Sequence, residues 1–161
     1  NVYESQGHYE RALEYHQKDL DITIKVVGHN HIEVADTYNN MAVVYDSQGH
    51  YERALEYYQK SLDIKIKVVG HDHIDVASTY QNIAATYQAQ GNEAGAIEMC
   101  TKAYRIFLKV LGPDHPSTLA MKPFHDGLRT EGGHDWRHFR RFWKCLFLYT
   151  ILGQMKFCFF F

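Results

Sequence analysis

The sequence has few cysteines and few prolines. Its 161 residues include 3 cysteines, 3 prolines and 2 tryptophans. Cys100, Cys145 and Cys158 show no Cys-x-x-Cys spacing, which argues against a disulfide framework and against a zinc site. Such sparse cysteine usage is typical of a reducing compartment, so we expect a cytoplasmic protein.

The sequence also lacks the motifs that accompany catalysis. It has no nucleophile motif, no glycine-rich phosphate loop and no carboxylate pair outside its repeated pattern. Histidines recur as His29-x-His31 and His71-x-His73, but the third copy has Pro113 in place of the first histidine, and no cluster of Cys or Glu lies nearby. We therefore predict no enzymatic activity, no metal site and no cofactor.

The charge is unevenly distributed along the chain. Residues 1–127 carry 11 basic and 17 acidic side chains, whereas residues 128–161 carry 6 and 2. A mildly acidic surface repels phosphate groups, so we expect no nucleic-acid partner for the first of these regions.

What the sequence does contain is a long internal repeat, with a period of about 42 residues. The segment that begins at Tyr3 is followed in register by one that begins at Tyr45, and the two are identical at 31 of 40 positions. A looser third copy begins at Tyr87. A short unit repeated at a fixed period must stack on its neighbours to bury its apolar face, and the resulting array offers an extended surface to other molecules. Because the sequence begins partway through a unit, we expect it to be part of a longer array.

The apolar residues within a unit have helical spacing. Val34, Tyr38 and Met41 lie three or four residues apart, as on one buried helix face. The pattern predicts two helices per unit and no strands, with a stub at residues 1–6 as the end of a helix whose start is missing. The predicted helices run roughly over residues 9–27, 32–48, 51–69, 74–90 and 93–111.

Glycines and polar residues mark the predicted turns. Gly7, Gly49 and Gly91 occupy the same place in successive units, where a tight turn between helices needs a residue that tolerates positive φ. Short polar linkers follow the second helices, and we expect their middle residues to cap the next helix. These expected caps are Asn30, Asp72 and Asp114.

One pattern of aromatic and small residues resembles a known family. Tyr38-x2-Met41-Ala42-x2-Tyr45, followed by Ala54-x3-Tyr58, resembles the tetratricopeptide signature, with Tyr in the usual Trp position and Ala in the usual Gly position. The unit is longer than the usual repeat of about 34 residues and lacks the closing proline, which makes it similar to the kinesin light chain type. The resemblance implies an all-α, right-handed α-solenoid of antiparallel helix pairs. It covers residues 1–122, with units at about 1–28, 32–70 and 74–112, a partial first helix from 116, and a non-repeat tail at 123–161.

The resemblance also implies a binding surface. In this family the first helices of successive repeats line a concave groove, and an asparagine before the small-residue pair holds the backbone of an extended peptide. That position is occupied by Asn40 and Asn82, while Phe124 interrupts the series in the next unit. The implied function is a non-catalytic scaffold for a protein or peptide partner. The other residues expected on this face are Asp36, Asn39, Val43, Asp46, Ser78, Gln81, Ala85 and Gln88.

Two alternatives stay open for this surface. Asn40 and Asn82 could instead cap or bridge neighbouring helices. The whole array could instead be a structural spacer or a self-stacking segment, because a missing first helix would leave Leu13, Tyr15, Leu20 and Ile24 partly uncovered and favour end-to-end association.

Basic residues are predicted on the second helices, where a solvated outer surface is expected. We therefore predict a neutral or mixed-charge peptide rather than a clamp for terminal carboxylates. These basic residues are Arg11, Arg53, Lys60, Lys65 and Lys67.

Residues 123–161 do not continue the repeat. Pro123 is expected to block helix continuation, and a basic aromatic run at 136–144 precedes an apolar end. Three interpretations stay open: a degenerate cap on the last repeat, a sequence artefact unrelated to the working protein, and a membrane anchor at 142–161. Lys144 and Lys156 weigh against the anchor, because a buried ammonium opposes membrane insertion.

Overall fold

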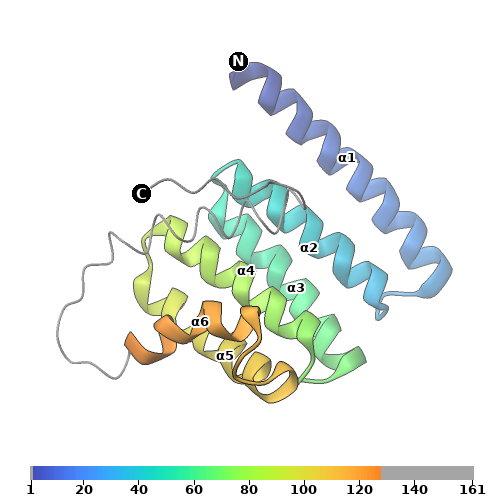
Figure 1. The fold of residues 1–161 in the computed structure, drawn as a ribbon. Coiled ribbons are helices and arrows are strands. Elements are labelled where there is room, and N and C mark those ends of the chain that lie inside the picture. The colour runs from blue at the N-terminus through green and yellow to red at the C-terminus, as the bar shows by residue number, and fades with distance from the viewer. Residues whose placement is uncertain (1, 128–161) are drawn as a thin grey trace. The chain divides into compact units, whose positions relative to one another are not determined.

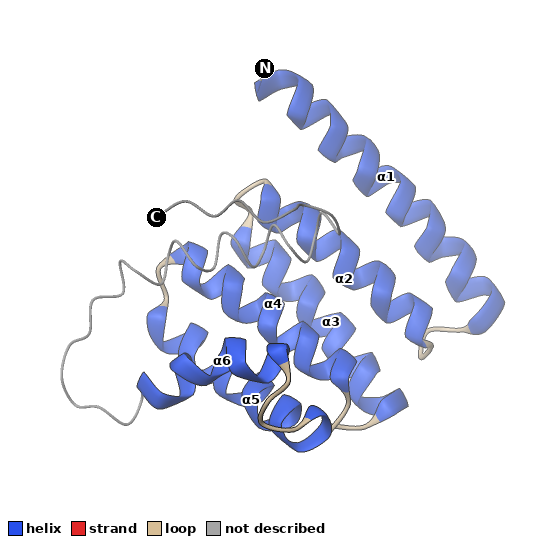
Figure 2. Ribbon diagram, in the orientation of Figure 1, coloured by secondary structure: helices blue, strands red, loops and turns tan. Residues whose placement is uncertain are grey.

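The computed structural model describes the backbone of residues 2–127 and the side chains of residues 8–122. This part of the chain consists of helices and loops without strands (Figure 2), so the predicted all-α fold is confirmed. Consecutive helices pack as antiparallel pairs (Figure 1). The elements are α1 (Val2–Val27), α2 (Ile32–Ser47), α3 (Tyr51–Val69), α4 (Ile74–Gln90), α5 (Glu93–Leu111) and α6 (Pro116–Gly127).

The helix boundaries keep the period of the sequence. α2, α4 and α6 begin at residues 32, 74 and 116, and α3 and α5 span 51–69 and 93–111. Gly49 and Gly91 have φ values of 77° and 83° at the turns between paired helices, a backbone conformation that disfavours any residue with a Cβ atom. The helix boundaries therefore recur with the same period as the sequence repeat.

The helix caps differ from the prediction. Asn30, Asp72 and Asp114 were expected to cap the first helices, but the N-cap residues of α2 and α4 are His31 and His73, whose Nδ1 atoms accept hydrogen bonds from the backbone N–H groups of residues 33 and 75. His115 Nδ1 likewise accepts from the N–H of residue 117 at the start of α6. The N-caps of α2 and α4 therefore lie one residue later than expected, and their backbone is extended. In each, an imidazole nitrogen supplies the acceptor that the free N–H groups at a helix start require.

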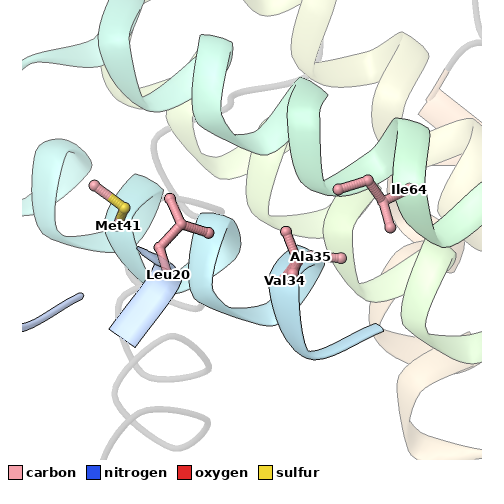
Figure 3. Close-up of a cluster of buried hydrophobic side chains, with 5 residues drawn as sticks. All are labelled: Leu20, Val34, Ala35, Met41 and Ile64. Atoms are coloured by element: carbon pink, nitrogen blue, oxygen red, sulfur yellow. The ribbon is translucent and has the colours of Figure 1, made fainter. Parts of the chain in front are cut away.

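A buried apolar cluster joins α1, α2 and α3. Leu20 from α1, Val34, Ala35 and Met41 from α2, and Ile64 from α3 form it, as Figure 3 shows. Thr37 Oγ1 of α2 also donates a 3.0 Å hydrogen bond to an Asp19 carboxylate oxygen of α1. α2 is therefore held on both sides, by the helix before it and the helix after it.

The start of α1 was predicted incorrectly. A turn was expected at Gly7, between a stub at residues 1–6 and a helix from residue 9, but α1 runs through this glycine without a break. Such a short stub cannot form a stable helical turn with its own packing, whereas continuing α1 gives the same residues backbone hydrogen bonds. The turn at Gly49 has a full helix on each side, and that packing is what this end of the chain lacks.

The exposed residues of α1 also differ from those expected. Leu20 is buried and Leu13 and Ile24 pack against the cluster, so this part of the predicted stripe is covered. Tyr15 is 70% exposed, as predicted, and Ile22 is 62% exposed. The uncovered apolar surface of α1 therefore faces away from α2.

α6 continues past the predicted break. The helix was expected to stop before Pro123, but it extends to Gly127. A proline inside a helix removes one backbone hydrogen bond and costs about 3 kcal/mol, which weakens or kinks a helix without always ending it. The burial of Thr118 and Met121 holds the first turns of α6 in place. The interpretations proposed for residues 128–161 lie outside the described residues.

Candidate functional site

The predicted binding residues lie on the two first helices, five on α2 and five on α4. We call them the first-helix surface. On α2 they are Asp36, Asn39, Asn40, Val43 and Asp46, and on α4 they are Ser78, Gln81, Asn82, Ala85 and Gln88.

An amide pair connects the two halves of this surface. Asn82 Nδ2 donates a 3.3 Å hydrogen bond to Asn39 Oδ1, although the two residues lie one repeat apart in the sequence. The structure therefore contains a contact of the kind expected if Asn82 bridges neighbouring helices. One such bond leaves the Asn39 amino group and the Asn82 carbonyl oxygen with unused hydrogen-bonding capacity.

Asn40 is in a different environment from Asn82, although the two occupy the same position in their units. It is exposed, and it makes no hydrogen bond to another residue in the described part of the chain. Among the described residues, the amide of Asn40 is therefore without a protein partner.

Asp36 forms an ion pair that the sequence did not suggest. The Lys65 ammonium lies 3.0 Å from an Asp36 carboxylate oxygen, and the Lys65 side chain is only 7% exposed. Lys65 was expected on the solvated outer surface with the other basic residues, and this prediction was wrong. The sequence did carry a signal, because Phe107 occupies the same position in the next unit and phenylalanine is seldom found on a solvated face.

The remaining basic residues are exposed, as predicted. Arg11, Arg53, Lys60 and Lys67 all have solvent-exposed side chains. Lys60 Nζ lies 4.6 Å from the centre of the Tyr57 ring, and the Arg53 guanidinium lies 5.7 Å from that of Tyr45. These cations therefore cover aromatic rings of the α2–α3 pair, with a modest stabilising effect typical of exposed sites.

Asp46 has the most unusual electrostatic environment on the first-helix surface. Burial raises the pKa of its carboxyl group, and a hydrogen bond with Thr86 partly opposes this shift. Its Oδ1 atom is buried and has no hydrogen-bond partner, and Gln48 Oε1 nearby in the sequence is in the same condition. A buried acceptor without a partner costs folding free energy, so Asp46 is a strained group of the fold at the end of α2.

The other predicted residues provide a mixed lining. Val43, Ala85, Gln81 and Gln88 are half-buried, so they offer small apolar areas between amide groups. Ser78 Oγ donates a 3.0 Å hydrogen bond to the carbonyl oxygen of residue 74 in its own helix. The first-helix surface is thus polar, and one acidic group on it, Asp36, is already paired.

These helix pairs, repeated at a fixed period with small buried residues between them, define a helical repeat protein of the solenoid class. Two models of the tetratricopeptide repeat match the sequence, at residues 1–67 and 76–117. The chain belongs to the tetratricopeptide repeat family, so the resemblance inferred from its residues is confirmed.

Solved structures of similar proteins give the same fold. A Podosopora anserina protein assigned as a kinesin light chain, with nearly identical TPR-like repeats, is 25% identical with a TM-score of 0.63, covering 75% of this chain and 57% of its own. Its Q17M variant is 24% identical with the same TM-score and coverage. BtubC (BKLC) from P. vanneervenii is 20% identical with a TM-score of 0.59, covering 80% of this chain and 61% of its own.

The chain therefore spans about three fifths of the length of these structural neighbours. No curated protein matches the sequence. The helices described in residues 2–127 include none that is long and apolar enough to cross a membrane. Within the same residues no three potential metal ligands lie together.

Proposed function

We propose that the protein is a non-catalytic interaction scaffold that binds an extended peptide segment of a protein partner along the first-helix surface. Tetratricopeptide repeats are in general protein–protein interaction modules, which supports the class of function. The observation that carries the finer proposal is the set of unused amide groups on α2 and α4. Asn40 has no partner among the described residues, and Asn39 and Asn82 keep an unused donor and an unused acceptor after bonding to each other.

A peptide backbone needs this combination of groups. An extended segment presents alternating N–H and C=O groups, and an amide side chain can bond to both whatever the side chains of the peptide are. Val43 and Ala85 leave room for small apolar side chains between these polar contacts.

The charges on this surface favour a peptide without a strong negative charge. Lys65 is already neutralised by Asp36, so no cation of this pair is free to hold a carboxylate. Asp46 would repel an acidic ligand. We therefore expect a neutral or mildly basic segment.

Selection from a phage library of random peptides, followed by calorimetry with the selected peptides, tests this proposal on the full chain. We expect Asn40→Ala combined with Asn82→Ala to weaken binding by more than about tenfold, since each lost hydrogen bond contributes about 0.5–1.5 kcal/mol. The control is Gln59→Ala, which removes an amide on α3 that bonds to Asp63 of the same helix.

Two results would overturn the proposal. One is a selection in which no recovered peptide binds more weakly after residues of the first-helix surface on α2 and α4 are substituted. The other is a double variant that binds normally but unfolds at a lower temperature, because the asparagines would then serve the fold and not a ligand.

A further inference from the structure

Two cations and three tyrosines gather on the α2–α3 helix pair, and none of them belongs to the first-helix surface. We call this group the tyrosine–cation cluster. The Tyr57 ring lies at its centre, 5.2 Å from the Tyr45 ring and 6.0 Å from the Tyr38 ring, measured between ring centroids. The three tyrosines are half-buried, whereas the two cations are exposed and open to solvent. The members of the cluster are Tyr38, Tyr45, Arg53, Tyr57 and Lys60.

Aromatic rings, and not carboxylates, hold the two cations in place. Lys60 Nζ lies 4.6 Å from the centre of the Tyr57 ring and 5.7 Å from that of the Tyr38 ring. The Arg53 guanidinium lies 5.7 Å from the centre of the Tyr45 ring. Among the described side chains, neither cation forms an ion pair with a carboxylate. Because a ring attracts a cation without carrying a negative charge of its own, both cations are positioned and still fully charged.

The next unit shows the ordinary alternative. Glu98 and Lys102 of α5 align with Glu56 and Lys60 of α3, and they form an ion pair of 2.7 Å. At the aligned positions of α5, a methionine replaces the central tyrosine and a glycine replaces the arginine. Glu56 and Lys60 make no such ion pair, so in α3 the central tyrosine ring takes the place of the carboxylate as the partner of the lysine. The cluster is therefore specific to the α2–α3 pair and not a general result of the repeat.

Phenol hydroxyl groups add hydrogen-bond donors to the cluster. The Tyr45 hydroxyl interacts with both Tyr57 and Arg53, because burial and then Tyr57 raise its pKa while Arg53 opposes this shift. The polar ends of these three side chains therefore lie close together. Phenols, guanidinium and ammonium groups all donate hydrogen bonds, and donors that carry a positive charge bond most strongly to oxyanions.

We propose that the tyrosine–cation cluster binds the phosphoryl group of a phosphorylated side chain on a protein partner. Two unpaired cations match the charge of a phosphoryl group, which is about −1.5 to −2 at neutral pH. The planar guanidinium of Arg53 can bond to two of its oxygens, while the Lys60 ammonium and a phenol hydroxyl can bond to others. A carboxylate would leave one of the two positive charges unmatched, so the charge of the cluster favours a phosphorylated side chain over an acidic one.

Glu56 is the acidic group on the same face of α3 as the two cations. It lies three residues after Arg53 and four residues before Lys60, a spacing that places side chains on one side of a helix. The preceding Glu52 is bonded instead to Gln90 of α4. Glu56 therefore opposes an anion at the cluster, and removing its charge should strengthen binding.

This proposal rests on the class of function proposed above, a scaffold for a protein partner, but not on the first-helix surface. The phosphoryl group would be a second contact point with the partner, separate from the peptide segment that binds α2 and α4. The two contacts can therefore be tested and rejected independently.

The test is a nuclear magnetic resonance titration of the full chain with a short alanine peptide that contains one phosphoserine. We expect this peptide to bind about tenfold more tightly than the same peptide with serine, and to shift resonances of α3. Arg53→Gln and Lys60→Gln should each weaken binding by about tenfold, because each removes a charge-assisted hydrogen bond. Lys102→Gln is the matched control, since it makes the same change where the lysine is already paired, and it should leave the affinity unchanged.

Glu56→Gln provides a gain that a purely structural role of the cluster would not produce. It should tighten binding of the phosphoserine peptide by about two- to fivefold, as expected for one exposed charge. All of these changes fall on exposed or half-buried side chains, and circular dichroism checks that the helices remain.

Several results would overturn the proposal. They are equal affinity for the peptides with and without phosphate, equal affinity for inorganic phosphate and the phosphoserine peptide, and equal losses from Lys60→Gln and Lys102→Gln. Binding to phosphatidylserine vesicles without binding to the phosphoserine peptide would also overturn it. Arg53→Gln should bind the peptides selected for the first-helix surface as the wild type does, so failure here is distinguishable from failure of the proposed function.

Discussion

α1 and α3 carry nearly the same sequence in different surroundings. Residues 9–27 and 51–69 are identical at 16 of 19 positions, but α3 lies between α2 and α4, whereas among the described helices α1 packs on α2 alone. As a result Ile64 is buried and Ile22 is exposed. The difference separates two kinds of interaction: those made within residues 9–27 or 51–69 of one helix, which the two copies share, and those made with neighbouring helices, which are more numerous for α3.

The largest difference is expected from removing the apolar side chain at the shared position. Ile64→Ala should lower the free energy of unfolding by about 2–5 kcal/mol, because it empties a buried site. Ile22→Ala should change it by less than about 0.5 kcal/mol at low protein concentration, because the side chain is in water. Urea unfolding followed by circular dichroism measures both. Equal losses for the two variants would show that α1 is covered in solution.

A smaller effect is expected from the ion pair that only the interior copy makes. Asp36→Asn should destabilise the protein by about 1–2 kcal/mol, since it leaves the Lys65 ammonium buried without its partner while Asp36 itself is partly in water. Thr23→Lys gives α1 the lysine that α3 has at the aligned position, and it should change the free energy of unfolding by less than about 0.5 kcal/mol. Thermal unfolding of the two variants beside the wild type compares them. If Asp36→Asn unfolds at the wild-type temperature, Lys65 must be solvated.

The histidine caps should have the same effect in both copies. His31→Ala and His73→Ala should each cost about 1 kcal/mol, because each removes the acceptor for a backbone N–H at a helix start. His29→Ala and His71→Ala change exposed histidines of the same linkers and serve as controls, with an expected change below about 0.5 kcal/mol. Chemical unfolding of all four variants tests this. A cap that matters in only one copy would mean that packing, and not the hydrogen bond, determines its contribution.

The smallest effect concerns Asp46, whose pKa is raised in the folded protein by burial. The folded state then binds more protons than the unfolded state between the usual pKa of the carboxyl group and its raised value. Stability from this group therefore increases as the pH falls through that window and decreases as the pH rises. We expect Asp46→Asn to be more stable than the wild type at neutral pH, with a gap that narrows on acidification. Thermal unfolding across the acidic range measures the gap, and a gap that widens on acidification would contradict the assigned direction.

The fold could be predicted from the sequence because two signals agree. The spacing of residues such as Val34, Tyr38 and Met41 indicates helices, and the fixed period of the sequence indicates that each pair repeats. Glycines with positive φ then locate the turns at Gly49 and Gly91. The equivalent glycine was misleading at Gly7, because the six residues before it are too few to form a separate helix that packs on the helix after it.

The site could be predicted only at the level of helices. Alignment of the copies placed Asn40 and Asn82 in one class, but their contacts differ, because Asn82 bonds to Asn39 of α2 and Asn40 is exposed. Lys65 was predicted to be solvent-exposed because lysine side chains usually are. Its partner Asp36 lies on a different helix, far away in the sequence. Contacts of this kind depend on how two helices are set against each other, which a single sequence pattern does not specify.

The way the helices contact one another also has a mechanical consequence. In the described part of the chain each helix packs mainly against the one before it and the one after it, so no contact ties distant repeats together. A pulling force applied at the two ends would therefore be resisted by one interface at a time. Among the described helices α1 and α6 each pack on a single neighbour, so these two should detach before the interior helices and the chain should lengthen in steps.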